Sequence, residues 1–362
     1  MRFRIPAAVL ALLIAAAPSG AQTVRGRMVD GQSGAGLGGA RVLLVDSAGR
    51  DASSATTDAR GGFVLNAGRA GRFTVRTERI GYAATVTPPF ALAAGETVER
   101  TIAATGARIA LEGVVATGRQ RCELRPGTGA RTVAVWEEAR KALSGARASA
   151  AEKAYLFELR RYHRRLDPRT EAVLHEDVSP QSGWSGDPFE AADPQALAAN
   201  GFVQQAHDTT RFFAPDEHVL LSDVFLAGHC FRLQEPPASH AGWIGLAFEP
   251  VHGSRTPTDV RGVLWVDRAT AELRSLEYRY TGLAGGARTE LLSRGSIDFR
   301  RLPDGSWIVQ RWRIRMPRVQ MARTGTNPMV SNMETATLTG LEEEGGDVTA
   351  VTTRTGRPAP AR

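Results

Sequence analysis

The 362-residue sequence predicts a mainly β protein, in which an N-terminal β-sandwich is followed by an antiparallel, half-barrel-like β domain with a short helix at their junction. Short apolar segments alternate with turns rich in Gly, Pro, Asp, Asn and Ser, a pattern typical of antiparallel strands. Hydrophobic residues make up 42% of the chain, which is enough for a packed core at this length. One segment, residues 132–143, has the apolar spacing of an amphipathic helix.

Residues 1–21 have the pattern of a secretory signal peptide. Arg2 and Arg4 precede an apolar run over residues 9–17 that is too short to span a bilayer, and small residues follow up to Ala21. We expect cleavage after Ala21, where no cysteine is present to carry a lipid anchor. The protein is therefore expected to be exported, to the periplasm or to the periphery of the outer membrane.

Residues 22–105 predict a sandwich of short strands. The segment 40–45 is apolar on both faces, which favours a central position in its sheet, while Phe73 and Val75 share one face of their strand. Strands or their leading turns are expected at residues 24–29, 40–45, 57–65, 71–76, 80–82 and 96–102.

Three motifs stand out in this sandwich: Gly26–Asp30 with Met28 at its apolar position, Thr57–Phe63, and Gly81–Tyr82. Together they resemble the carboxypeptidase regulatory-like domain, a transthyretin-like sandwich with a carbohydrate-binding-like fold. In the second motif the Thr and Asp side chains cap a tight turn, glycine takes a positive φ angle, and Phe63 fills the core. The resemblance implies a fold but little about activity, because this module is an accessory in many exported proteins.

Residues 106–131 are expected to form a linker. Within it, residues 111–119 are similar to the segment that joins such a sandwich to the plug of TonB-dependent receptors, but no plug or long barrel follows. The helix over 132–143 is expected to begin at Thr132 as its N-cap. Its apolar face comprises Val133, Trp136, Ala139 and Leu143.

Residues 132–345 are expected to form one antiparallel β domain with this leading helix. Residues 155–162 are compatible with a strand or with an extension of the helix. Residues 346–362 are rich in Gly, Thr, Arg and Pro, which predicts a disordered tail. Further strands are expected at 218–226, 230–233, 243–248, 263–267, 273–280, 296–299 and 307–316.

The strand 307–316 is expected to have one apolar and one cationic face. Ile308, Trp312, Ile314 and Met316 face one way, and Val309, Arg311, Arg313 and Arg315 face the other. This strand and residues 262–283 are similar to the curved antiparallel half-barrel of periplasmic lipoprotein-carrier-like proteins. That resemblance implies a lipid or lipoprotein carrier.

Two site predictions follow from single residue types. Cys122 and Cys230 are the two cysteines of the chain, and cysteines of an exported protein usually pair, although two free buried thiols are the alternative. Trp184 lies in the polar segment 182–187, which predicts an exposed loop aromatic and a candidate binding surface. The alternative is that Trp184 folds back over the core.

The sequence contains no recognisable catalytic, cofactor-binding or metal-binding motif. Neither H-E-x-x-H nor H-x-x-E occurs, although zinc carboxypeptidase chemistry needs closely spaced His and Glu ligands. A serine triad from Ser222, Asp223 and His229 lacks the sharp G-x-S-x-G turn. A cluster in space of His218, His229, His240 and His252 stays open.

The net charge of +7 would suit nucleic acid, but export argues against that partner. The excess of arginine then reflects either genome composition or attraction to anionic lipid headgroups or lipopolysaccharide. No apolar stretch after the leader reaches the length of a membrane helix, so the chain is not expected to span a membrane.

The function that these observations favour is that of an exported, non-catalytic cell-envelope protein with a binding or adaptor role. Its partner would be an envelope protein, a glycan or a lipid, and no cofactor is expected. Two alternatives stay open: a lipid or lipoprotein carrier, and a hydrolase or carboxypeptidase-associated protein whose site is not visible in the sequence.

Overall fold

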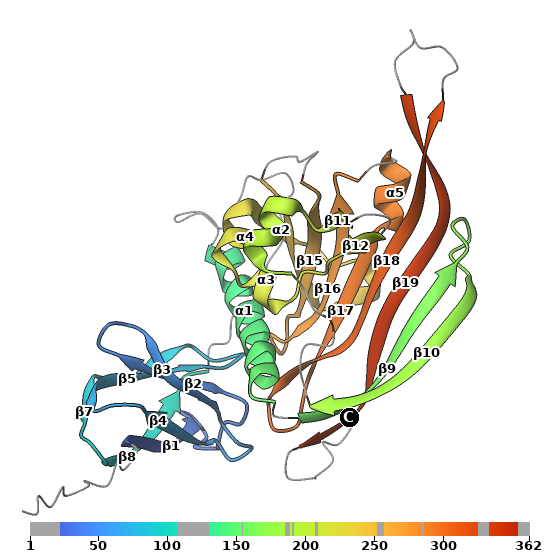
Figure 1. Cartoon of the computed structure of the whole chain (residues 1–362). Helices are drawn as coiled ribbons and strands as arrows, with labels where there is room; N and C mark the ends of the chain where they lie inside the picture. The colour runs from blue at the N-terminus through green and yellow to red at the C-terminus, as the bar shows by residue number, and fades with distance from the viewer. Residues whose placement is uncertain are drawn as a thin grey trace, which may run out of the picture.

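The computed structural model confirms the mainly β architecture, with a small sandwich beside a larger β domain (Figure 1). It describes residues 22–106, 130–153, 155–184, 189, 192–206, 209–251, 257–283, 286–324 and 333–353. The predicted signal peptide, most of the predicted linker and Cys122 lie outside these residues.

The sandwich has two sheets that enclose a continuous apolar core. One sheet has the order β4-β1-β8, and the other has the order β3-β2-β5-β6 with β7 paired to β5. The buried core between them includes Val24, Leu44, Phe63, Phe73 and Val75, so Phe73 and Val75 do share a face. The strands are β1 (Gln22–Asp30), β2 (Arg41–Asp46), β3 (Asp51–Thr56), β4 (Gly62–Ala67), β5 (Gly71–Glu78), β6 (Thr85–Val86), β7 (Phe90–Leu92) and β8 (Thr97–Ala104).

The two turn motifs of the sandwich behave differently. The Asp58 carboxylate accepts the backbone N–H groups of Arg60 and Gly62, and Gly61 has a φ of 85°, as the motif predicts. Residues 80–82 do not form a strand: Tyr82 makes a single bridge to Gly106, and the segment is a turn. The predicted central strand is confirmed, because β2 lies between β3 and β5.

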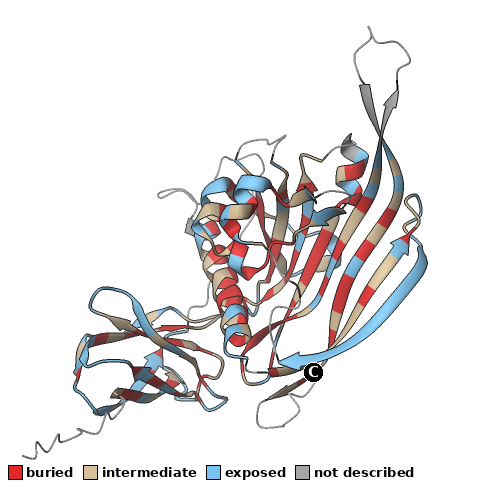
Figure 2. Cartoon of the chain, viewed as in Figure 1, coloured by how far each residue is buried: buried red, intermediate tan, exposed pale blue. Residues whose placement is uncertain are grey.

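The larger domain is built on a nine-stranded antiparallel sheet with the order β10-β9-β19-β18-β17-β16-β15-β14-β13. The sheet curves, and the helices and the small hairpin β11–β12 lie on its inner face, while β10 is exposed along its whole length (Figures 1 and 2). Among the described strands, β19 joins the β9–β10 hairpin to the rest of this sheet. Its strands are β9 (Tyr155–Leu166), β10 (Val173–Trp184), β13 (His229–Gln234), β14 (Trp243–Pro250), β15 (Asp259–Asp267), β16 (Leu273–Thr281), β17 (Arg294–Arg301), β18 (Trp307–Thr324) and β19 (Met333–Thr353), and the hairpin is β11 (Val203–Ala206) with β12 (Thr209–Phe212).

The long helix α1 (Ala130–Ala151) packs against the inner face of the sheet. Trp136, Ala139 and Leu143 are buried as predicted, but Val133 is 40% exposed and Val135 takes its place in the core. The prediction that Thr132 caps the helix is wrong, because α1 begins two residues earlier, at Ala130, and at its other end it runs eight residues further than predicted. The shorter helices are α2 (Pro194–Asn200), α3 (Glu217–Leu220), α4 (Asp223–Gly228), the 3₁₀ turn η1 (Ala238–His240) and α5 (Gly286–Leu292).

The prediction of a strand over residues 218–226 is wrong, because two short helices occupy this segment. The Asp216 side chain accepts the N–H of Val219 and starts α3, and Ser222 accepts the N–H of Phe225 and starts α4. The apolar run hides these two caps, since its residues pack on the core from helices instead of from a strand.

The predicted faces of β18 are wrong at its first residues. Phe299 pairs with Val309 and Asp298 pairs with Arg311, so Gln310 is an extra residue that forms a bulge. Val309 therefore joins the inner core with Trp312, whereas Ile308 packs in a separate cluster. Beyond the bulge, the arginines do line the opposite face.

The C-terminal boundary also differs from the prediction. Strand β19 continues to Thr353 by pairing with β9 at Tyr155, so residues 346–353 are ordered strand and not tail. Residues 155–162, which the sequence left open, belong to β9.

The sandwich docks on α1 through a turn whose side-chain partners are buried. Lys141 Nζ lies 2.6 Å from the Glu138 carboxylate and donates to the Tyr82 carbonyl at 2.8 Å. The other Glu138 oxygen accepts the N–H of Gly81 at 2.9 Å. Because Glu138 and Lys141 are 1% and 7% exposed, this contact is shielded from water and fixes the turn to the helix.

Candidate functional site

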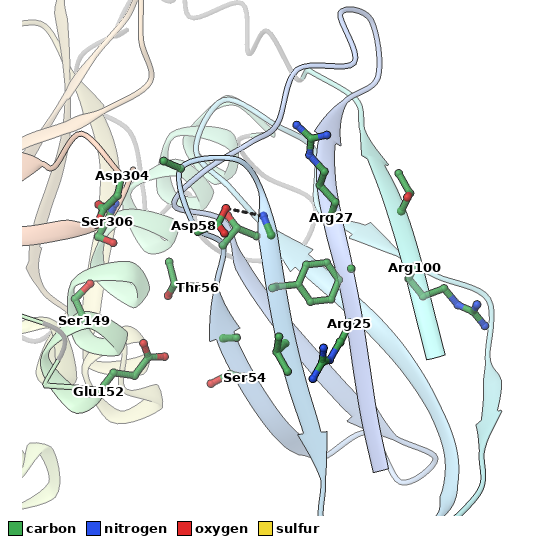
Figure 3. A pocket seen from close by; sticks show the side chains of 18 of the residues that line it. Arg25, Arg27, Ser54, Thr56, Asp58, Arg100, Ser149, Glu152, Asp304 and Ser306 are labelled. Carbon is green, nitrogen blue, oxygen red and sulfur yellow. Dashed lines mark hydrogen bonds between the residues drawn. The ribbon is translucent and has the colours of Figure 1, made fainter. Parts of the chain in front are cut away.

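A cleft of about 1040 Å³ separates the sandwich from the larger domain, and we call it the interdomain cleft. The sandwich wall comes from β1, β3, β4 and β8, and the other wall comes from the end of α1, the start of β9 and the turn between β17 and β18 (Figure 3). The lining polar residues labelled there are Arg25, Arg27, Ser54, Thr56, Asp58, Arg100, Ser149, Glu152, Asp304 and Ser306.

The sandwich wall presents charged and hydroxyl side chains in rows. On β1, Arg25 lies between Val64 of β4 and Glu99 of β8. Arg27 follows two residues later on the same face, and its Nε donates to the Arg60 carbonyl at 2.8 Å. The Arg25 side chain makes no hydrogen bond or ion pair within the described part of the chain, so its guanidinium is available to a ligand.

The opposite wall is held by a hydrogen-bonded group around Tyr155. The Tyr155 hydroxyl donates to the Asp304 carboxylate at 2.5 Å and lies 2.7 Å from the Ser306 hydroxyl. Burial raises the pKa of Tyr155, so its hydroxyl stays protonated. Burial also raises the pKa of Glu152, at the end of α1.

The chemistry of the cleft is that of hydrogen bonding. Side chains with both donor and acceptor capacity alternate with charged groups, and Val64, which is 50% exposed, adds an apolar patch. Across the described ranges, no group of three or more His, Cys, Asp or Glu side chains is placed to hold a metal ion.

Trp184 lines a second and smaller hollow of about 220 Å³, which we call the Trp184 groove. The structure places this residue at the end of β10 and not in a loop, and its side chain is 52% exposed. The groove lies between α1 and the strands β9, β18 and β19. Its apolar lining includes Phe157, Leu159, Trp307 and Val309.

Other side chains that the sequence singled out have local structural partners. The Ser222 hydroxyl donates to the Val219 carbonyl at 2.7 Å while it caps α4. The two ring nitrogens of His229 lie 2.9 Å from the Phe225 carbonyl and 3.1 Å from the Val260 carbonyl. His229 Nε2 also lies 3.2 Å from the Asp259 carboxylate. Ser222 and His229 thus have separate local partners, and His252 lies outside the described residues.

Cys230 lies in β13 and is half-buried. Because Cys122 lies outside the described residues, the disulfide between them stays a prediction. The Thr57–Phe63 motif lines part of the interdomain cleft, but no pattern in the sequence indicates that Arg25 and Asp304 face one cleft, because only the docking of two domains brings them together. In the part of the chain that is described, no helix is both long and apolar enough to cross a membrane.

Comparison with known families identifies the N-terminal module. Residues 23–105 match the carboxypeptidase regulatory-like domain, so the sandwich is a domain of this class and the resemblance seen in its motifs is confirmed. The match covers the sandwich alone and leaves the larger domain unassigned. No curated protein sequence matches the chain.

Solved structures offer only distant likeness. The backbone protein of the group B streptococcus pilus 2b is 16% identical over 24% of this chain and 41% of its own length, with a TM-score of 0.19. The Bacillus anthracis TIE protein is 10% identical over 46% of this chain and 27% of its own, with a TM-score of 0.21. BcpA, the major pilin subunit of Bacillus cereus, is 9% identical over 94% of this chain and 92% of its own, with a TM-score of 0.22. The chain thus spans less than half the length of the first two.

Proposed function

We propose that the protein is an exported, non-catalytic binding protein of the cell envelope that holds a polyhydroxylated ligand, such as a glycan, in the interdomain cleft. The observation that carries this proposal is the composition of the cleft, in which two domains contribute hydroxyl and charged side chains to one hollow of about 1040 Å³. A sugar presents donors and acceptors around its ring and an apolar C–H face. The serines, threonines and Arg25 suit the former, and Val64 suits the latter.

The docking of the domains supports this role. The buried contact of Lys141 with Glu138 and Tyr82 holds the walls at a fixed separation, so little ordering is required when a ligand enters. Export is proposed on the leader pattern of residues 1–21. Fractionation of a cell that produces the full chain tests it: recovery of an uncleaved chain in the cytoplasm would contradict export.

Binding to an array of neutral and acidic oligosaccharides tests the proposed ligand class. Arg25→Ala and Glu152→Ala should each weaken binding by about tenfold, the value of one charge-assisted hydrogen bond. Arg72→Ala removes an exposed arginine outside the cleft and should leave the affinity unchanged. If no glycan binds, or if all three variants bind alike, the proposal fails.

A second candidate function rests on the Trp184 groove, which suits the acyl chain of a lipid. Its lining is largely apolar and includes the half-exposed ring of Trp184. Its volume of 220 Å³ is below that of a usual small-molecule site. Organic extraction of the purified protein, followed by mass spectrometry, tests it. Lipid that is recovered from the unmodified protein and lost in Trp184→Ala would favour the carrier role.

A further inference from the structure

Four arginines on the outer face of the large sheet lie in register across four adjacent strands. Arg261 of β15 pairs with Arg279 of β16, Arg279 pairs with Arg294 of β17, and Arg294 pairs with Arg315 of β18. We call these four residues the arginine row. Cross-strand neighbours stand about 4.5–5.5 Å apart at Cβ, and like charges placed directly opposite each other are destabilising.

Beyond β18, the line of cross-strand partners that begins with the arginine row alternates in charge, as is expected on a stable sheet surface. Arg315 pairs with Glu343 of β19, Glu343 pairs with Arg164 of β9, and Arg164 pairs with Glu176 of β10. Ion pairs join all of these neighbours, with Arg315 Nη2 2.7 Å and Arg164 Nη1 3.1 Å from the Glu343 carboxylate. The arginine row is therefore an exception along a line of cross-strand partners whose charges otherwise alternate.

The two ends of the arginine row differ in their side-chain partners. Arg294 and Arg315 both contact the Glu171 carboxylate, Arg294 at 2.5 Å. Arg261 and Arg279 are exposed, and their guanidinium groups form no ion pair or hydrogen bond with any described residue. Burial lowers the pKa of Arg294, and the charge of Arg315 lowers it further, with smaller effects of Arg279 and Arg313, while Glu171 opposes the shift.

A hollow of about 580 Å³ lies along this row, and its rim carries five arginines but two carboxylates, those of Glu249 and Glu277. Between the arginines, on the same face of the sheet, the hollow is lined by the small side chains of Ala247, Val263 and Ser296. Three steps between strands make the row roughly 14 Å long, at about 4.8 Å per step. The hollow is lined by residues of the adjacent strands β13 to β18, so it extends in the direction in which the charges repeat, and Arg261, Arg279 and Arg294 of the row line it.

We propose that the arginine row binds a linear acidic polysaccharide whose carboxylate groups lie along the hollow. Guanidinium groups recognise carboxylates through paired, charge-assisted hydrogen bonds, and a polyanion relieves the repulsion between Arg261, Arg279 and Arg294. The site is separate from the interdomain cleft, so it does not depend on the proposed function.

An anionic membrane is the less favoured partner, because the sheet is convex on this face and would meet a flat bilayer along a narrow line (Figure 1). None of the side chains that line the hollow is among the exposed large hydrophobic residues of the described chain. A surface that docks on lipid usually adds such anchors to its charges.

The test uses the full-length mature protein and isothermal titration with oligogalacturonate, with neutral dextran, inorganic polyphosphate and vesicles containing phosphatidylglycerol as comparisons. R261Q/R279Q should weaken oligogalacturonate binding by about tenfold or more, while R72Q/R147Q removes the same charge elsewhere and should change nothing. Added salt should weaken binding by the unmodified protein. The melting temperature of R261Q/R279Q should rise above that of the unmodified protein. Such a rise would show that the variant folds and that repulsion between the arginines destabilises the sheet.

The outcomes separate the sources of the anion. Oligogalacturonate binding that is lost in R261Q/R279Q alone supports the proposal. Equal loss in both double variants would mean unspecific attraction by net charge, and binding to vesicles or polyphosphate without oligogalacturonate would mean another partner. Either of these results overturns it, as does an absence of binding to all four probes.

Discussion

The Tyr82 hydroxyl donates a hydrogen bond to the Asp30 carboxylate at 2.9 Å, and it joins two motifs that lie 52 residues apart in the sequence. The other Asp30 oxygen accepts the N–H groups of Gln32 and Ser33. The Tyr82 carbonyl in turn accepts from Lys141. The Gly26–Asp30 and Gly81–Tyr82 motifs of the sandwich thus meet at the turn that contacts α1 of the larger domain.

Asp30 predicts an acid-dependent loss of stability. Hydrogen bonds from Ser33 and Tyr82 lower the pKa of Asp30 from 3.8 to about 2. A lowered pKa stabilises the fold above pH 4, and that contribution is lost as the pH falls from about 4 to 2. In urea unfolding followed across this range, Asp30→Asn should flatten the pH dependence. An unchanged slope would contradict the assignment.

Lys141→Met should destabilise the protein by about 3–5 kcal/mol, because it leaves the Glu138 carboxylate buried without its cation. Removing both charges in Lys141→Met/Glu138→Leu should recover part of this loss. Calorimetry checks both variants, and a second unfolding transition in the single variant would show that the sandwich has come free. Equal stabilities of the two variants would argue against a buried ion pair.

Gly39→Ala should weaken the contact between the domains. Gly39 has a φ of 70°, and a Cβ there would lie 2.1 Å from the carbonyl carbon of Gly305. Gly49 has a similar φ of 78° but no atom within 4 Å, so Gly49→Ala measures the backbone cost alone. We expect Gly39→Ala to cost about 1–3 kcal/mol more than the control, through overpacking. Similar melting temperatures for the two variants would contradict the predicted clash between residue 39 and Gly305.

Ser222→Ala should cost about 1 kcal/mol, the value of a helix N-cap, because its hydroxyl starts α4. Ser222→Asp keeps a capping oxygen and should restore most of the stability. If Ser222 were instead a nucleophile, a serine-directed fluorophosphonate would label the unmodified protein and neither variant. Labelling of the unmodified protein at Ser222 would show that this residue does more than cap α4.

The disulfide between Cys122 and Cys230 predicts almost no free thiol in the denatured, unreduced monomer. Its reduction should lower the stability by about 3–5 kcal/mol, as expected for a loop of this length. Two titratable thiols per chain would show that the cysteines do not pair. Cys122→Ser/Cys230→Ser provides the matched reference for both measurements.

Local patterns were enough to predict the sandwich and most strands of the large sheet, because turn residues and alternation act over a few positions. The segment 218–226 was misjudged because its caps, Asp216 and Ser222, also fit turns. The faces of β18 were misjudged at one bulge, since Gln310 shifts the alternation by one residue.

The two proposed sites depend on relationships that no local pattern contains. The interdomain cleft requires the docking of Tyr82 on α1. The arginine row requires the register of four strands, and a shift of one residue in β16 would turn Arg279 to the other face. Trp184 was found because a large aromatic in a polar segment is visible in the sequence alone.

The place of β19 has a consequence for the order in which the chain can assemble. The hairpin of β9 and β10 is synthesised before the rest of its sheet, but Leu166 finds its partner Leu341 only when the last strand arrives. Closing so long a loop is entropically costly and slows folding. The hairpin must therefore wait for the final strand, and a chain that ends before residue 333 would keep β9 without its second neighbour.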